Sequence, residues 1–307
     1  MGQDRIKNIF FIGGVPRSGT SLVQKILDGH SNIYAGPEFD HLPSICTLFH
    51  NMKRGIENGR QVFYYDRLIL EDSFKQFIWN ILISKAEREN VMYISEKTPS
   101  NLFVFDELNQ IFPNAKFIIV LRDPRDCLVS FKKVNEKAKE FGDDIDLGKD
   151  LYKDLNFIID YVDHGERFYL NNKSKRYLIK YEKLITNPII EIKSLCRFLN
   201  ISFEESMLEL HKNINDASKL INASHKTVRA WSYPGMLDSN VDSSNHEKWK
   251  IELSKLEKGL INNFFSVTRS EFFKEYNFKA LSFMDKVKMI PSYIKKFGLK
   301  KLLLRQL

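Results

Sequence analysis

A short stretch near the amino end combines the residue types that bind an anion. Residues 9–27 read IFFIGGVPRSGTSLVQKIL, an apolar run followed by a glycine-rich turn and an amphipathic segment. In such a strand–turn–helix unit the backbone N–H groups point into one concavity, and the helix start adds partial positive charge. Arg17 supplies a permanently charged planar fork, and Ser18, Thr20 and Ser21 supply hydroxyl groups. The sequence therefore predicts an oxyanion site at this turn.

The loop differs from the phosphate-binding loops of kinases and NTPases in one position. Those loops carry a lysine directly before the Ser/Thr, where Gly19 stands here, and they hold Mg²⁺ beside the phosphates. We find no convincing acidic strand end for a metal ion. A phosphate-like group handled without magnesium is therefore expected, and a sulfuryl group, which carries less charge than a phosphoryl group, meets that description.

The elements around this turn predict an α/β fold. Apolar runs typical of buried parallel strands alternate with segments whose apolar residues recur every three or four positions. We expect a P-loop-like three-layer fold with a central, mostly parallel sheet flanked by helices. Strands are predicted at 9–12, 34–37, 91–95, 117–121 and 176–180. Helices are predicted at 18–29, over most of 41–90, at 101–112, from about 126 through Ser130, at 147–162 and at 192–199.

The organisation of the chain is that of one large domain. Its 307 residues, 43% of them hydrophobic, suffice for a single core, so we predict one domain over 1–280. A long loop is expected at 222–245, which lacks periodicity. Residues 281–307 form a basic amphipathic tail, for which a packed last helix and a helix on a membrane surface are the two alternatives.

Charge and cysteine content restrict the partners and the compartment. The formal charge of +8 favours anionic ligands, but no basic stripe with interleaved aromatic residues indicates nucleic acid. Three unpatterned cysteines, Cys46, Cys127 and Cys196, favour buried thiols over disulfides or a zinc site. No run approaches the roughly 20 apolar residues that span a bilayer. With its first strand starting near residue 9, the chain is expected to be cytoplasmic.

Several motifs together resemble one enzyme family. GVPRSGTSLV, GPEF, EKTPSN, FPNAKFIIVLRDPRDCLVS and YEKLITNP stand in the order seen in sulfotransferases that use PAPS, 3′-phosphoadenosine 5′-phosphosulfate. The chain is most similar to the bacterial proteins related to tyrosylprotein sulfotransferases. The resemblance covers about residues 7–200 and continues more loosely through SHKTVRAW and HEKWKIELS to about 275. It implies sulfuryl transfer from PAPS, with PAP as product and no metal.

The resemblance also assigns residues to the nucleotide. PRSGT in this family binds the 5′-phosphosulfate, and the RDPRD…S segment binds the 3′-phosphate. Arg122 would otherwise form an ordinary salt bridge with Asp123 or Asp126, and Tyr181 would otherwise be a core aromatic. Lys132 and Lys133 lie near a further basic position of the family but are out of register. The implied nucleotide-binding residues are Pro16, Arg17, Ser18, Gly19, Thr20, Ser21, Arg122, Ser130 and Tyr181.

Sulfuryl transfer needs a base for the acceptor proton and cations for the sulfuryl and the leaving oxygen. Glu38 is the preferred base because it follows the second strand and GPEF resembles the family's glutamate segment; His41 is the second candidate. Lys97 matches the lysine that stabilises the bridging oxygen, and Arg17 is expected at the sulfuryl oxygens. Ser224 resembles a serine that assists this lysine. Lys248 and Arg229 are weaker candidates.

Other readings stay open at this point. A degenerate P-loop kinase or NTPase would bind ATP with Mg²⁺, and a non-catalytic nucleotide-binding protein would bind PAP without turnover. The acceptor is a hydroxyl of undetermined class: sugar, tyrosine, lipid or small metabolite. Residues 40–75, 135–150 and 222–245 are the expected substrate loops, and they match no subfamily. The oligomeric state is open as well, with a homodimer among the alternatives.

Overall fold

The computed structural model describes residues 6–83, 91–210 and 246–297. Its centre is a sheet of five strands in the order β2-β3-β1-β4-β5, and every neighbouring pair runs parallel. The predicted α/β fold with a parallel sheet is confirmed. The strands are β1 (Asn8–Gly14), β2 (Ile33–Ala35), β3 (Tyr93–Lys97), β4 (Lys116–Leu121) and β5 (Arg176–Lys180).

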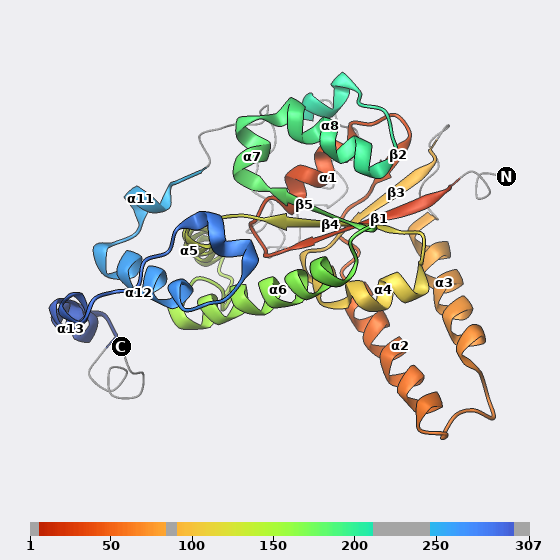
Figure 1. Ribbon diagram of the computed structural model, residues 1–307, viewed down its shortest axis with the longest axis horizontal. Coiled ribbons are helices and arrows are strands. Elements are labelled where there is room, and N and C mark those ends of the chain that lie inside the picture. The colour runs from red at the N-terminus through yellow and green to blue at the C-terminus, as the bar shows by residue number, and fades with distance from the viewer. Residues whose placement is uncertain (1–5, 84–90, 211–245, 298–307) are drawn as a thin grey trace.

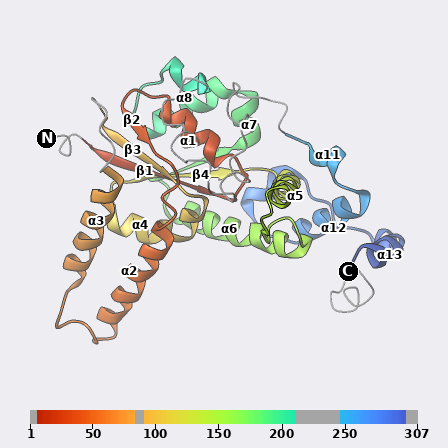
Figure 2. The ribbon, with the colours of Figure 1, turned by 180° about the vertical axis from the view of Figure 1, so that it is seen from behind.

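Helices cover both faces of this sheet (Figures 1 and 2). On one face lie α1 (Thr20–Asp28), α7 (Tyr181–Thr186) and α8 (Pro188–Leu199); on the other lie α4 (Phe105–Ile111) and α6 (Leu151–Asn171). A hairpin of α2 (Leu42–Glu57) and α3 (Arg67–Ile83) projects away from the sheet. The remaining described elements are α5 (Pro124–Glu140), α11 (Trp249–Glu252), α12 (Lys255–Ser266), α13 (Phe283–Phe297) and the 3₁₀ helices η2 (Pro99–Val104), η3 (Glu205–Leu208) and η6 (Glu271–Tyr276).

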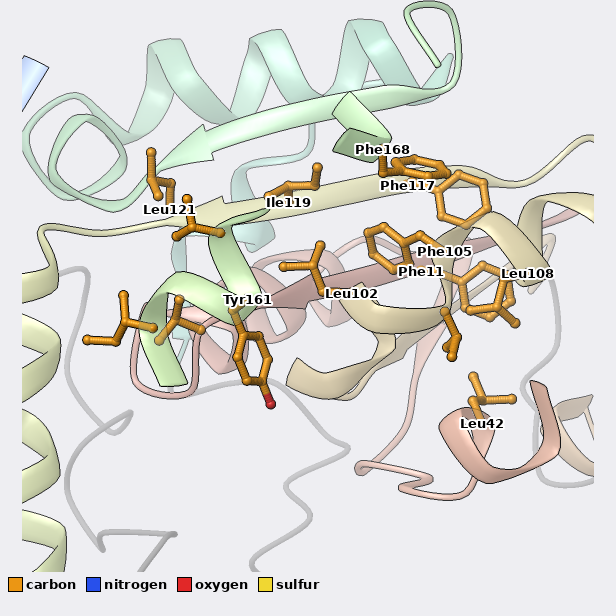
Figure 3. Close-up of a cluster of buried hydrophobic side chains, with 14 of the residues drawn as sticks. Phe11, Leu42, Leu102, Phe105, Leu108, Phe117, Ile119, Leu121, Tyr161 and Phe168 are labelled. Atoms are coloured by element: carbon orange, nitrogen blue, oxygen red, sulfur yellow. The ribbon is translucent and has the colours of Figure 1, made fainter. Parts of the chain in front are cut away.

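The central strands are apolar without interruption because both of their faces are covered. Along β4, Phe117 and Ile119 join the core beneath α4 and α6, whereas Ile118 and Val120 join the core beneath α1 and α8. This alternation follows from the period of two of a strand. In the first core, the Phe117 ring lies 4.8 Å from Phe168 and 5.0 Å from Phe105, measured between ring centroids (Figure 3).

The parallel sheet gathers the predicted motifs at a single edge. Because all five strands run the same way, the turns that follow them lie at their common carboxyl edge. The PRSGT turn follows β1, GPEF follows β2, EKTP overlaps the end of β3, RDPRD follows β4 and YEKL follows β5. Five segments that are distant in the sequence thus meet beside the start of α1.

Several element boundaries differ from the sequence expectation. The strand expected at 34–37 is Ile33–Ala35, the strand expected at 91–95 is Tyr93–Lys97, and the helix expected from about 126 begins at Pro124. Two further differences have local reasons. The helix expected at 147–162 begins at Leu151, because Gly148 adopts a φ of 83° and the Asp150 side chain caps the helix by accepting from the N–H of Tyr152. The segment expected as a helix at 101–112 is instead η2 followed by α4, since the turn starts at Pro99.

The described part of the carboxyl-terminal tail packs on the domain. Tyr293 of α13 is fully buried against Leu256 and Leu260 of α12, and Lys296 donates to Glu257 at 2.7 Å. Residues 298–307 lie outside the described residues, as does the whole of the loop expected at 222–245. Within the described ranges no helix has the length and apolar character needed to cross a bilayer.

The three cysteines are free and buried: Cys46 and Cys127 in the core beneath α4 and α6, and Cys196 in the core beneath α1 and α8. Cys46 lies on α2, Cys127 on α5 and Cys196 on α8. Burial raises the pKa of the Cys46 and Cys127 thiols above their usual range and that of Cys196 to about 11. The expectation of buried thiols is met.

We predict that Phe117→Ala lowers the free energy of unfolding by about 3–5 kcal/mol, since it removes a fully buried ring from the aromatic core. Phe63→Ala is the matched control because Phe63 is 92% exposed, and it should change the same quantity by less than about 0.5 kcal/mol. Urea unfolding followed by circular dichroism measures both. Equal effects of the two substitutions would contradict the core described here.

Candidate active site

The turn after β1 has the backbone of an anion-binding loop. Arg17 and Gly19 both take left-handed conformations, with φ of 70° and 103°, so successive N–H groups turn toward one side before α1 begins. Gly19 cannot be replaced without a clash, because a β-carbon there would lie 2.4 Å from the Tyr181 ring. The close approach of β1 and β5–α7 at this point therefore depends on a glycine.

The loop also presents a hydroxyl group that the described protein does not satisfy. The Ser18 side chain is fully buried, and its Oγ has no hydrogen-bond partner among the described residues. A buried hydroxyl without a partner is costly, and an anionic ligand at the start of α1 supplies the missing acceptor. Pro16 and Ser21 are partly exposed at the same turn, whereas Thr20 is buried. The loop thus fits a sulfate- or phosphate-like group.

Arg17 brings together the two residues expected at the 3′-phosphate. Its Nε donates to Ser130 Oγ at 3.0 Å, and its carbonyl oxygen accepts from Arg122 Nη1 at 3.1 Å. Burial and the charge of Arg122 lower the pKa of Arg17, and Glu38 acts in the opposite direction. Two neighbouring cations form the positive end of the site.

Tyr181 packs against Arg122 and against the loop at Gly19. It is buried at the start of α7, and the Arg122 guanidinium stacks on its ring with 4.3 Å between the Cζ atom and the ring centroid. The same ring touches the Gly19 position. Tyr181 is therefore both a core aromatic and a part of the candidate site, because it supports Arg122 and the loop together.

Lys97 links the loop to the candidate base. It ends β3, and its Nζ donates to Ser21 Oγ at 3.0 Å and to the Glu38 carboxylate. The Lys97 side chain is only 7% exposed, whereas that of Glu38 is 38% exposed. Lys97 is therefore a nearly buried ammonium with a fixed direction, and not the solvated surface charge expected of a lone lysine.

The remaining candidates lie less centrally or outside the described residues. His41 is exposed at the start of α2, with its ring edge-on to Phe39. Lys132 and Lys133 on α5 form ion pairs with Glu257 and Glu252. Lys248 precedes α11 and is partly buried. Ser224 and Arg229 fall within 211–245, outside the described residues.

Sequence reasoning missed a buried polar group directly beside Lys97. The Glu96 carboxylate is 3% exposed and accepts hydrogen bonds from Thr98, from Asn101 and from the backbone N–H of Phe39. Burial raises its pKa to about 7, against the opposing effect of these hydrogen bonds and of Lys97. The signal was present in the sequence, since a glutamate inside an otherwise buried strand requires partners.

A second missed group anchors the region after the central loop. Asp126 in the first turn of α5 accepts from the N–H groups of Glu247 at 2.7 Å and Trp249 at 3.0 Å. Its neighbour Arg125 stacks on the Trp249 ring at 3.9 Å and forms an ion pair with Asp123. The RDPRD turn therefore attaches residues 247–249 to the edge of the site. Asp123 and Asp126 have structural partners of their own.

The arrangement can bind a doubly anionic ligand and move one proton. Arg17, Arg122 and the loop N–H groups offer positive charge, Lys97 offers a directed ammonium, and Glu38 offers a partly exposed carboxylate. Among the described residues, no group of three or more His, Cys, Asp or Glu side chains is placed to hold a metal ion. The chemistry that this geometry suits is the transfer of an oxyanion group between two oxygen atoms.

Comparison with known protein families identifies the relatives of this chain. Residues 10–205 match the model of the sulfotransferase family. Protein-tyrosine sulfotransferase 1 of Danio rerio is 30% identical over 217 residues, which are 68% of this chain and 58% of the relative. The matches to Caenorhabditis elegans and Gallus gallus protein-tyrosine sulfotransferases cover 57% and 53% of those proteins. The chain thus matches little more than half the length of these relatives.

Solved structures share the fold. The sulfotransferase domain of the curacin biosynthetic pathway superposes with a TM-score of 0.59 at 22% identity, covering 85% of this chain and 97% of that domain. Mouse sulfotransferase SULT7A1, solved in complex with PAP, superposes with a TM-score of 0.54 at 14% identity, covering 88% of this chain and 89% of its own. At this identity the likeness concerns the architecture.

Proposed function

The chain belongs to the sulfotransferase family, and from that premise we propose that it transfers the sulfuryl group of PAPS to a hydroxyl acceptor. The observation that carries the proposal is the placement of Lys97, whose Nζ reaches both Ser21 of the anion loop and the Glu38 carboxylate. One ammonium thereby connects the place where the donor binds to the group that takes the acceptor proton.

The anion loop holds the 5′ end of the donor. The N–H groups before α1, the unsatisfied Ser18 hydroxyl and the Ser21 hydroxyl surround the phosphosulfate. Arg122 and Ser130 hold the 3′-phosphate, with Tyr181 supporting Arg122 from behind. Arg17, already bonded to Ser130, lies between the two ends and neutralises the sulfuryl oxygens.

The reaction is an in-line displacement at sulfur. The acceptor oxygen forms a bond to sulfur while the bond from sulfur to the 5′-phosphate oxygen breaks. Glu38 takes the proton of the acceptor hydroxyl, and its partial exposure leaves it accessible to an acceptor. Lys97 stabilises the charge that accumulates on the departing oxygen of PAP.

The acceptor is a hydroxyl group, and the relatives of the chain suggest which kind to test first. The relatives named above are protein-tyrosine sulfotransferases, so a phenolic hydroxyl is the first acceptor to test. Sugar hydroxyls and other alcohol hydroxyls are compatible with the same displacement reaction. The kinase alternative is disfavoured because its loop lysine is absent, and the non-catalytic alternative because Arg17, Glu38 and Lys97 are all in place.

The donor assignment predicts which nucleotide stabilises the protein. PAP at a concentration of about 100 times its Kd should raise the free energy of unfolding by about 2.7 kcal/mol. ATP with Mg²⁺ at the same concentration should raise it much less, because the loop lacks the features of an NTPase. Thermal unfolding with each nucleotide measures the difference. A larger effect of ATP with Mg²⁺ would favour a kinase.

The 3′-phosphate assignment predicts a selective defect. Arg122→Ala should weaken PAP binding by about 1.5–3 kcal/mol, the usual contribution of a charge-assisted hydrogen bond. Its binding of adenosine 5′-phosphate, which lacks the 3′-phosphate, should change much less. Lys133→Ala, which removes a surface cation paired with Glu252, is the control for general electrostatics. Calorimetry gives the affinities, and an equal loss for both nucleotides would mean that Arg122 only supports the fold.

The base assignment predicts a defect in turnover alone. Glu38→Gln should lower kcat about 10²- to 10⁴-fold, the range for loss of a general base. The amide still accepts a hydrogen bond from Lys97, so PAP affinity should stay near that of the wild type. His41→Ala, three residues away, serves as the comparison. PAP release is the assay, and a large loss in His41→Ala with near-normal Glu38→Gln would transfer the role to His41.

A further inference from the structure

The segment that carries Glu38 has no regular secondary structure of its own. Residues 36–41 lie between the end of β2 and the start of α2, and Asp40 adopts a left-handed φ of 60°. This conformation is uncommon for a residue with a β-carbon, although aspartate adopts it more readily than most residues. A base on such a segment would be poorly directed unless its backbone were held from outside.

The end of β3 supplies that hold. The N–H of Phe39 donates to Glu96 Oε1 at 3.2 Å, and the N–H of Asp40 donates to Thr98 Oγ1 at 3.2 Å. The Thr98 hydroxyl in turn donates to Glu96 Oε1 at 2.8 Å. The two N–H groups directly after Glu38 are thus bound by the two residues that flank Lys97. We call Glu96, Thr98 and these two N–H groups the β3 clasp.

On the basis of the proposed function, we infer that Glu96 and Thr98 are positioning residues that fix the Glu38 carboxylate opposite Lys97. The β3 clasp and the Lys97–Glu38 ion pair both join residues 38–40 to residues 96–98. The clasp binds backbone N–H groups, whereas the ion pair joins two side chains. The direction of Glu38 relative to Lys97 is therefore set by three consecutive residues of one strand end.

The chemistry of Glu96 supports a role beyond filling space. A fully enclosed carboxyl group pays a desolvation penalty that an apolar residue of similar size would avoid. Its second oxygen, Oε2, accepts from Asn101 Nδ2 of η2, so each carboxylate oxygen is used. The carboxyl group provides a hydrogen-bond acceptor for the Phe39 N–H, which an apolar side chain would lack.

The hold itself can be measured without any substrate. In Glu96→Ala the amide protons of Phe39 and Asp40 should exchange with solvent at least about 10-fold faster. The segment can then open without first breaking the hydrogen bonds to Glu96. Asp154→Ala is the matched control: it removes another buried carboxyl group, which binds the N–H of Gly148 away from the site. Nuclear magnetic resonance reads both amides. Unchanged exchange at Phe39 and Asp40 in Glu96→Ala would overturn the inference.

A double-mutant cycle tests whether the clasp acts through the base. With PAPS and 2-naphthol, Glu96→Ala should lower kcat about 10²-fold, as expected for a misplaced catalytic group, with PAP affinity nearly unchanged. In the Glu38→Gln background the same substitution should cost less than about threefold, because the group it positions is already absent. Losses that multiply would assign Glu96 a merely structural role. Absence of any PAP release by the wild type would count against the proposed function and leave the exchange measurement decisive for the clasp.

Glu96→Gln is the conservative variant. Gln keeps an oxygen for the Phe39 N–H, and its amide can donate to Asn101 Oδ1, which has no partner among the described residues, after Asn101 turns over. It should therefore recover most of the kcat that Glu96→Ala loses. A Gln variant as slow as the Ala variant would show that the charge itself is needed and would contradict positioning by hydrogen bonds.

The pH dependence of stability provides an independent check on the buried carboxyl group. Since the pKa of Glu96 is raised to about 7 in the fold, the folded state binds the proton more tightly than the unfolded state. The contribution of Glu96 to stability should accordingly fall as pH rises from about 4.5 to about 7. Lys97, Glu38 and Asp40 also face this region, and they remain in Glu96→Gln, so the difference between the two proteins isolates Glu96. Identical pH profiles of unfolding would show that the fold does not raise the pKa of Glu96.

Discussion

The site depends on keeping two arginine side chains together at the carboxyl edge of the sheet. Arg122 donates to the backbone of Arg17, and its charge contributes to the lowered pKa of Arg17. Two neighbouring cations repel each other; an aromatic ring lies under Arg122, and a hydroxyl group accepts a hydrogen bond from Arg17. An anion relieves the repulsion, so affinity for a doubly charged ligand is a consequence of the arrangement.

The parallel sheet explains why this arrangement was largely predictable. Motifs that follow strands must gather at one edge, so Arg17, Glu38, Lys97, Arg122 and Tyr181 could be placed together from the sequence. The contact between Arg17 and Ser130 could not, because it depends on the rotation of α5 against a loop 113 residues earlier. The expected strand–helix alternation was likewise sound, whereas helix starts such as Leu151 depended on local caps.

The polar groups that sequence reasoning missed share a physical cause. Glu96 and Asp126 bind backbone N–H groups that lie 57 and 121 residues away in the chain. Such carboxylates accept hydrogen bonds from backbone N–H groups of segments without regular secondary structure. Every residue except proline has a backbone N–H, so the sequence does not show which one is bound. Each fixes a segment that borders the site: Glu96 the stretch after Glu38, and Asp126 the start of α11. The motifs of the candidate site are visible in the sequence, whereas the residues that support them are visible only in three dimensions.

The burial of all three cysteines has a practical use. Thiol reagents attack the thiolate, and burial that raises the pKa of Cys46, Cys127 and Cys196 leaves almost none of it near neutral pH. The tip of the α2–α3 hairpin, by contrast, exposes Phe63 almost completely. A cysteine introduced there would accept a fluorophore or spin label selectively, without removal of the native thiols. The projecting hairpin thereby becomes a reporter position on an otherwise unmodified protein.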